Sequence, residues 1–386
     1  MSITANPTKM MRNSLTNYLR KFSLLKLDYL TVQSPKYYLF IRAFAIFNLI
    51  ALNTKFIIFI TVKLDHKTAL NFGDYAINWS KPHHFLLFIN ILWITCGLSS
   101  FYLFQRTNDA PKKQFWVQYL SILDADISDW KHSTKSIIIY LFFFTLKCNL
   151  FLGAAFSWVL YIPVLSESAS LKQLFFISLG SYNGAVAGYC CTSICVNFSF
   201  IFAFYSLTTG LRYDKLASRF AKQASTLSDP TIVDTINKEL IQLLIENHKA
   251  NYFWTQLNSI VFLLTFFALI PILYLIFFVP LTNFVNFAMV ILGALNFLCG
   301  QSITFLSGSF AKTKFDRCYK QLNRVLISRD DFNFNHRIQL ICSADYLINR
   351  HLFYIFGGFE FSQMSYLLVI LEIISLLLLL LANAGR

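Results

Sequence analysis

The sequence contains few charged residues for its length. Asp, Glu, Lys and Arg make up 13% of 386 residues, whereas hydrophobic residues make up 56%, and an ordinary soluble domain has about 25% charged residues. One aqueous core of this size cannot hide so much apolar surface. The scarcity of charge therefore argues against a soluble protein and predicts a chain that lies in a lipid bilayer.

The motifs of soluble enzymes are missing as well. The sequence has no Walker loop, no glycine fingerprint for dinucleotides, no His-Glu-x-x-His pair and no Cys-x-x-Cys pair. We therefore expect neither enzyme activity nor a cofactor. His83 and His84 are adjacent, but two neighbours do not easily share one ligand face, so we interpret them as an interfacial polar pair and expect no metal site.

Two further absences concern targeting and symmetry. Residues 1–38 lack the early apolar core of a secretory signal peptide, so the first membrane span is expected to direct insertion. No internal repeat relates the two halves of the chain, and this counts against the duplicated folds of many secondary transporters.

Seven apolar stretches are long enough to cross a hydrocarbon core, which requires about 20 helical residues. They lie at residues 39–62, 84–105, 137–163, 172–206, 252–279, 281–307 and 352–383. The fourth and the seventh are much longer than necessary, so we expect each to be tilted, broken or continued into water as helix. The fifth and the sixth nearly touch, which predicts a tight antiparallel hairpin.

Basic residues are concentrated on one side of these spans. Segments 1–38, 106–136, 207–251 and 308–350 carry 25 Lys and Arg residues, and the opposite segments carry five. This imbalance predicts a cytoplasmic N-terminus and an extracellular C-terminus. It also explains the net charge of +14 as a topology signal, so we expect no nucleic-acid partner.

The predicted outer segments agree with this topology. Asn78 begins a glycosylation sequon in the first of them. None of the eight cysteines falls in an outer segment, so the sequence implies no disulfide framework and favours reduced, buried thiols.

The two longest cytoplasmic segments are predicted to be helical. In 207–251, Asp229 and Pro230 form a helix start, and apolar residues follow at helical spacing toward the fifth span. The same spacing continues through 308–350 toward the seventh span. We expect these amphipathic extensions to form a cytoplasmic anchor layer that supports assembly. The predicted fold class is thus an all-α integral membrane protein of a single seven-helix transmembrane domain, residues 1–386.

Five ionisable residues fall within the predicted spans: Arg42, Lys55, Lys147, Glu360 and Glu372. A charge at the bilayer centre costs on the order of 2.5–3.5 kcal/mol by insertion scales. Arg42 and Lys55 lie near span ends and can extend toward the interface. Lys147 and Glu372 lie deeper, so each should face a counter-charge, a bundle interior or water, and Glu372 is the preferred pathway residue.

The fourth span carries glycines every four residues from Gly180 to Gly188, which permits close helix approach. Aromatic and hydrogen-bonding side chains accompany this glycine face and the outer end of the third span. These candidate pocket residues are Trp158, Tyr161, Tyr182, Asn183 and Tyr189. They are interpreted either as the lining of an outward-facing small-molecule pocket or as interfacial aromatic anchors.

Seven spans, a cytoplasmic N-terminus and basic helical cytoplasmic segments resemble the insect gustatory and odorant receptor superfamily. Gustatory receptors typically end in Thr-Tyr, five apolar residues and Gln-Phe. Here Ser365-Tyr366 and Glu372-Ile373 keep that spacing with conservative replacements. In a second possible register, which matches the family's preceding Gly-Phe segment at Gly358-Phe359, the motif falls at Ser375-Leu376 and Ala382-Asn383 and its side chains are lost. The chain thus resembles a divergent gustatory-receptor-like member.

The resemblance implies a ligand-gated, non-selective cation channel in the plasma membrane, multi-pass and typical of sensory neurons. It further implies a homo- or hetero-tetramer with related receptor subunits, whose seventh spans surround a pore. Glu372, Ser365 and Ser375 would then be pore residues, and a small-molecule ligand would bind among spans two to six.

Three alternatives remain at this stage. A G-protein-coupled receptor would need an extracellular N-terminus, which the distribution of basic residues contradicts. A secondary transporter would use Lys147 and Glu372 as an ion-coupling pair. A receptor-like scaffold would keep the fold without a conducting pore.

Overall fold

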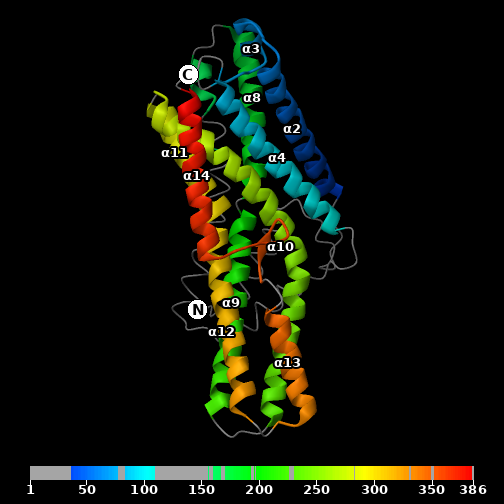
Figure 1. Ribbon diagram of the computed structural model, residues 1–386. Helices are drawn as coiled ribbons and strands as arrows, with labels where there is room; N and C mark the ends of the chain where they lie inside the picture. The colour runs from blue at the N-terminus through cyan, green and yellow to red at the C-terminus, as the bar shows by residue number, and fades with distance from the viewer. Residues whose placement is uncertain are drawn as a thin grey trace, which may run out of the picture. The chain divides into compact units, whose positions relative to one another are not determined.

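The structure is a computed structural model that describes residues 36–76, 83–108, 155, 160–166, 170–192, 195, 197–225, 230–281, 283–329, 332–348 and 352–384. Most of these residues are helical (Figure 1). In chain order the elements are α2 (Lys36–Thr61), α3 (His66–Asn71), α4 (His83–Asn108), α7 (Ile162–Ser166), α8 (Leu171–Cys191), α9 (Asn197–Ser225), α10 (Pro230–Phe278), α11 (Asn283–Leu295), the π-helix η3 (Asn296–Ser302), α12 (Ile303–Ser328), α13 (Phe334–Ile348), β1 (Tyr354–Ile355), β2 (Phe359–Glu360) and α14 (Gln363–Ala384).

The described chain forms two compact units. Unit 1 contains the elements from α2 to α8, the part of α10 that begins at Ile260, α11 and η3 to Gln301, and α14 from Val369. Unit 2 contains α9 from Ile201, α10 to Ser259, and the chain from Ser302 to Leu368. The long helices α9, α10 and α14 therefore contribute to both units.

Unit 1 is built around α2, α4 and α8, which lie side by side (Figure 1). Their contacting faces are apolar: Leu49 and Phe56 of α2, Leu87 and Ile94 of α4, and Ile177 of α8 are all buried. Each such side chain contributes about 1.5–3 kcal/mol when it leaves water. In a bilayer the same faces instead hold the helices together by close packing.

Unit 2 combines the part of α9 that begins at Ile201 and the part of α10 that ends at Ser259 with α12 and α13. Its interior is aromatic: the ring of Phe202 lies 5.3 Å from those of Trp254 and Phe353 and 5.5 Å from that of Phe361. A buried hydrogen-bond chain accompanies it, in which the Tyr205 hydroxyl donates to Asn247 at 2.9 Å. Aromatic rings therefore dominate the interior of unit 2, and they come from the parts of the fourth, fifth and seventh predicted spans that adjoin the predicted cytoplasmic segments.

Ion pairs on the surface of unit 2 link its helices. Arg212 of α9 pairs with Glu246 of α10 at 2.8 Å. Asp214 of α9 accepts from Lys314 and Arg317 of α12 at 3.2 and 2.6 Å. Because these groups are partly exposed, each pair contributes little by itself, and together they fix the register of neighbouring helices.

A short antiparallel hairpin precedes α14. Tyr354 pairs with Glu360 and Ile355 with Phe359. The turn places Phe356 at φ 51° and Gly357 at φ 79°, and this left-handed geometry suits glycine. The hairpin lies where the sequence predicted the start of the seventh span. The helix itself, α14, begins only at Gln363, after the two glycines at 357 and 358, so the predicted start at 352 is corrected, and the excess length of this stretch is taken up by the hairpin.

The helices coincide with the predicted spans at most other places. Six helices of the described residues are long and apolar enough to cross a membrane, and the predicted third span, 137–163, lies largely outside these residues. Within the fourth predicted span, α8 ends at Cys191 and α9 begins at Asn197, and the described residues between them, Thr192 and Cys195, are π-helical. Helix α10 begins at Pro230 and continues to Phe278, as the helix start at Asp229-Pro230 predicts.

The close packing of α12 against the residue that follows the hairpin can be tested by substitution. A Cβ atom added at Gly308 of α12 would lie 2.6 Å from the Cβ atom of Phe361, whereas one added at Gly358 would meet nothing within 4 Å. We expect Gly308→Ala to lower the free energy of unfolding by about 1–3 kcal/mol because of overpacking, and to lower the thermal midpoint of the detergent-purified protein. Gly358→Ala should have little effect, and equal midpoints for the two variants would contradict this packing.

Candidate functional site

Unit 1 contains a cavity of about 60 Å³. Its wall is formed by α2, α4, α8 and α11 together with Tyr75 and Tyr161. The lining residues are mostly apolar, with a few hydrogen-bonding groups: Leu52, Phe56, Tyr75, Ile89, Asn90, Trp93, Ile94, Leu160, Tyr161, Gly184, Ala187, Gly188, Cys191, Thr192, Leu292 and Leu295. Such a composition is typical of small-molecule sites, although those sites are usually larger, about 300–1,000 Å³.

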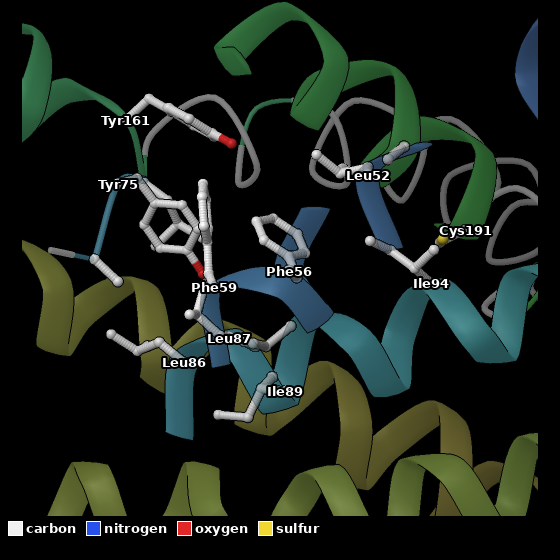
Figure 2. Packing of buried hydrophobic residues seen from close by; sticks show 14 of the residues in the cluster. Leu52, Phe56, Phe59, Tyr75, Leu86, Leu87, Ile89, Ile94, Tyr161 and Cys191 are labelled. Carbon is white, nitrogen blue, oxygen red and sulfur yellow. The ribbon is translucent and has the colours of Figure 1, made fainter. Parts of the chain in front are cut away.

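Aromatic rings form one wall of the cavity. The rings of Tyr75 and Tyr161 lie 5.1 Å apart, and those of Phe56 and Tyr75 lie 6.1 Å apart in an edge-on arrangement. Figure 2 shows Tyr75 and Tyr161 approaching Phe56 from the same side. The amide of Asn90 donates to the Tyr75 hydroxyl and, at 2.8 Å, to the carbonyl of Leu86. Burial raises the pKa of the Tyr75 phenol well above its ordinary value, so this hydroxyl stays neutral at physiological pH.

A charged network holds the segment that carries Tyr75. Asp74 is 1% exposed, and its carboxylate accepts from the backbone N–H of Ala76 at 3.0 Å and lies 2.8 Å from Nε2 of His83. The Lys55 ammonium donates to the carbonyl of Gly73 at 3.1 Å. His83 was interpreted as one of an interfacial polar pair with His84. The two rings lie 5.1 Å apart, and Asp74 is a further partner of His83.

The glycine face of α8 contributes to this arrangement. A Cβ atom at Gly180 would lie 3.2 Å from the ring of Tyr161 and 3.4 Å from Nζ of Lys55. Gly180 thus leaves room for both side chains. Lys55 was predicted to extend toward the outer face, and its ammonium indeed donates to the carbonyl of Gly73, which belongs to the predicted outer segment 63–83.

The five predicted pocket residues do not all lie at the cavity. Tyr161 lines the cavity. Tyr182 is 58% exposed and does not line it. The backbone carbonyl of Asn183 accepts from Asn48 of α2 at 3.1 Å, and Tyr189 packs against the core cluster of unit 1. Trp158 lies outside the described residues. Tyr182 and Asn183 are displaced because the cavity side of α8 is formed by Gly184, Ala187 and Gly188.

Sequence reasoning missed most of the cavity wall. Phe56, Asn90 and Trp93 lie within spans that were read only as apolar stretches. The polar or amphipathic side chains inside these spans could have indicated the cavity wall, because such groups rarely face lipid. Tyr75 lies between two helices, and no local pattern distinguishes it.

The predicted pore residues lie on α14. Glu372 and Ser375 are exposed, and Ser365 is partly buried and hydrogen-bonded to the hydroxyl of Ser362 at 2.8 Å. Only 11% of the membrane-compatible window of α14 is buried within the chain. Glu360, which was predicted to lie within this span, belongs instead to β2 and lies 3.3 Å from the Lys312 ammonium. Lys147 and Asn78 lie outside the described residues.

Among the residues that the structure describes, no group of three or more His, Cys, Asp and Glu side chains is placed to hold a metal ion.

Fold and site define an all-α, multi-span membrane protein with a small internal cavity. No family model and no curated protein matches the chain. Twelve chains of solved structures do match in three dimensions. One of them is the insect olfactory receptor OR5 from Machilis hrabei, with a TM-score of 0.70 and 11% sequence identity, covering 97% of this chain and 99% of that chain. The chain therefore has the fold of an insect olfactory receptor, and the predicted resemblance is confirmed at the level of the fold.

The network around Asp74 generates a stability prediction. Asp74→Asn removes the negative charge beside His83 and Lys55, and we expect a loss of about 2 kcal/mol in the free energy of unfolding because His83 loses its buried carboxylate partner and the Lys55 ammonium its nearby opposite charge. Adding Lys55→Met should restore part of this loss. The measurement is the thermal midpoint of the purified variants.

Asp65→Asn is the matched control for this prediction. Asp65 caps α3 by accepting from the backbone N–H of Thr68 at 3.1 Å, and Asn caps helices about equally well. This variant should therefore melt close to the wild type. Equal destabilisation at positions 65 and 74 would show that the network has no special role.

Proposed function

We propose that the chain is a gustatory-receptor-like chemosensory receptor that acts as a ligand-gated, non-selective cation channel. It works as a homo- or hetero-tetramer with related receptor subunits in the plasma membrane of sensory neurons. The likeness to an insect olfactory receptor over 97% of the chain and the cavity in unit 1 both support this proposal.

The exposure of α14 is the observation that carries the channel proposal. This helix is apolar enough to cross a membrane, yet most of its surface is not covered by the rest of the chain, and Glu372 is exposed near its middle. A carboxylate that faces lipid at this depth is costly. A helix that lines a water-filled path between subunits avoids that cost, and its carboxylate ring then attracts cations.

The polar residues of α14 share one side of the helix. Ser365 and Glu372 are seven residues apart, which separates them by about 20° around the axis, and Ser375 lies about 60° from Glu372. Val369 and Ile373 are the buried residues of this helix. A pore that faces Ser365, Glu372 and Ser375 is therefore compatible with packing of Val369 and Ile373 against the same chain.

The cavity is proposed as the ligand site. It lies in unit 1, which also contains α14 from Val369. A ligand that binds more tightly to one packing of these helices shifts the equilibrium toward that packing. Opening of the pore then follows from a change in the position of α14.

Unit 2 is proposed as the anchor layer in which subunits meet. Helix α13 exposes Phe334, Ile338 and Ile341, which recur at helical spacing on one side. Such an apolar face needs a partner in water. Neighbouring subunits supply that partner in a tetramer.

The proposed topology can be tested directly. An epitope tag before Met1 should be reached by antibody only after permeabilisation, whereas a tag after Arg386 should be reached in intact cells. Asn78→Gln should remove one glycan and increase the electrophoretic mobility of the protein. Labelling of the N-terminal tag in intact cells would favour a G-protein-coupled receptor topology.

The channel proposal is tested by whole-cell recording during application of a tastant panel while external cations are varied. We expect a ligand-evoked cation current, and Glu372→Gln should lower the preference for divalent over monovalent cations because the local negative field is lost. Glu239→Gln is the control, since Glu239 pairs with Arg219 in unit 2. Saturable uptake without current would favour a transporter, and surface-expressed protein without either would favour a scaffold.

A further inference from the structure

Two cysteines of unit 1 that are far apart in the sequence lie thiol to thiol. The thiol of Cys195 donates to the sulfur of Cys96 on α4 at 3.4 Å, although 99 positions separate the two residues. Both are free cysteines, and both are buried, with 1% of each residue exposed. The hydroxyl of Ser100, one turn after Cys96, lies 4.0 Å from Sγ of Cys195. The side chain of Cys195 is therefore held against α4 by two groups.

The pair lies at the junction between α8 and α9. Thr192 and Cys195 are π-helical, and π-helical turns inside longer helical segments are frequent at functional sites. A Cβ atom added at Gly97, the residue after Cys96, would lie 2.8 Å from Sγ of Cys191, so the backbone of α4 passes close to the end of α8. A bond between Cys96 and Cys195 would thus join α4 to this junction.

The cavity of unit 1 extends to the same junction. Cys191 and Thr192 line it, and its volume of about 60 Å³ admits a neutral molecule as small as hydrogen peroxide. A charged thiol such as glutathione does not enter an apolar site, because it would lose its hydration without finding a counter-charge. The surroundings of the pair therefore favour a small neutral oxidant over a charged reductant.

Hydrogen peroxide balances the oxidation of the two thiols. One thiol sulfur attacks a peroxide oxygen, the O–O bond breaks, and water leaves as the sulfur becomes a sulfenic acid. The second sulfur attacks the sulfenic sulfur, the S–S bond forms, and the hydroxyl leaves with the remaining thiol proton as a second water. Two thiols are thus oxidised to one disulfide while the peroxide is reduced to two waters. The reaction is slow, because the thiolate is the nucleophile and apolar surroundings disfavour it.

We propose that Cys96 and Cys195 are an oxidation site, at which hydrogen peroxide forms a disulfide that ties α4 to the junction between α8 and α9. The sulfur atoms have to approach from 3.4 Å to about 2.05 Å, a displacement within the reach of side-chain rotation. The bond closes a long loop and thereby restricts the unfolded chain, so the oxidised protein is more stable than the reduced one.

The test exposes the detergent-purified full chain to hydrogen peroxide overnight. The remaining thiols are then alkylated with N-ethylmaleimide under denaturing conditions, and the peptides are mapped by mass spectrometry. We expect a pair of peptides linked through Cys96 and Cys195 that dithiothreitol separates. The thermal midpoint of the oxidised protein should lie about 5 °C above that of the reduced protein.

Substitutions assign the bond to these two residues. Cys96→Ala and Cys195→Ala should each abolish the linked peptides and the rise in the midpoint, while their midpoints in dithiothreitol stay close to that of the reduced wild type. Cys191→Ala is the matched control, since it removes a neighbouring buried thiol and should keep both effects. Cys342 is exposed, so its oxidation shows that the peroxide was active.

Two results would overturn the inference. In one, Cys342 is oxidised while Cys96 and Cys195 are recovered separately alkylated. In the other, the wild type links Cys96 to Cys191 and leaves Cys195 free. Neither readout requires a ligand or a current, so this inference and the channel proposal can fail independently of each other.

Discussion

The carboxylate of Asp74 is buried at the end of the helices of unit 1 and lies 2.8 Å from Nε2 of His83. Beside it, the ammonium of Lys55 is bound to the carbonyl of Gly73. Where apolar helices end, polar groups can leave water only if each of them finds a partner. The segment between α2 and α4 therefore has one arrangement in which Asp74, His83 and Lys55 are all satisfied, and the neighbouring geometry depends on it.

The shape of the cavity depends on this arrangement of Asp74, His83 and Lys55. Tyr75 directly follows Asp74, and its ring packs between Phe56 and Tyr161. Gly180 leaves space on α8 for both Tyr161 and Lys55. The polar network thus positions the aromatic side chains that form one wall of the cavity.

The two units bury their surfaces in different ways. Unit 2 closes an aromatic interior around Phe202 and Trp254 and adds ion pairs at its surface. In contrast, α14 remains largely uncovered although it is one of the most apolar segments of the chain. The exposed surface of such an apolar helix can lie against lipid.

Length and composition alone determined that the protein spans a membrane and where most of its helices lie. They also predicted that α10 continues from Pro230 into a span. These features can be predicted because apolar runs and helix starts are local properties of the sequence. The sequence also contained the glycine pair at 357–358 that ends the helical pattern, although its effect was missed. The cavity was decided only by tertiary structure. Asp74 and His83, and Lys55 and Gly73, meet only in the folded chain, and Trp93 and Tyr161 line one cavity there. A single sequence carries no record of contacts between distant residues.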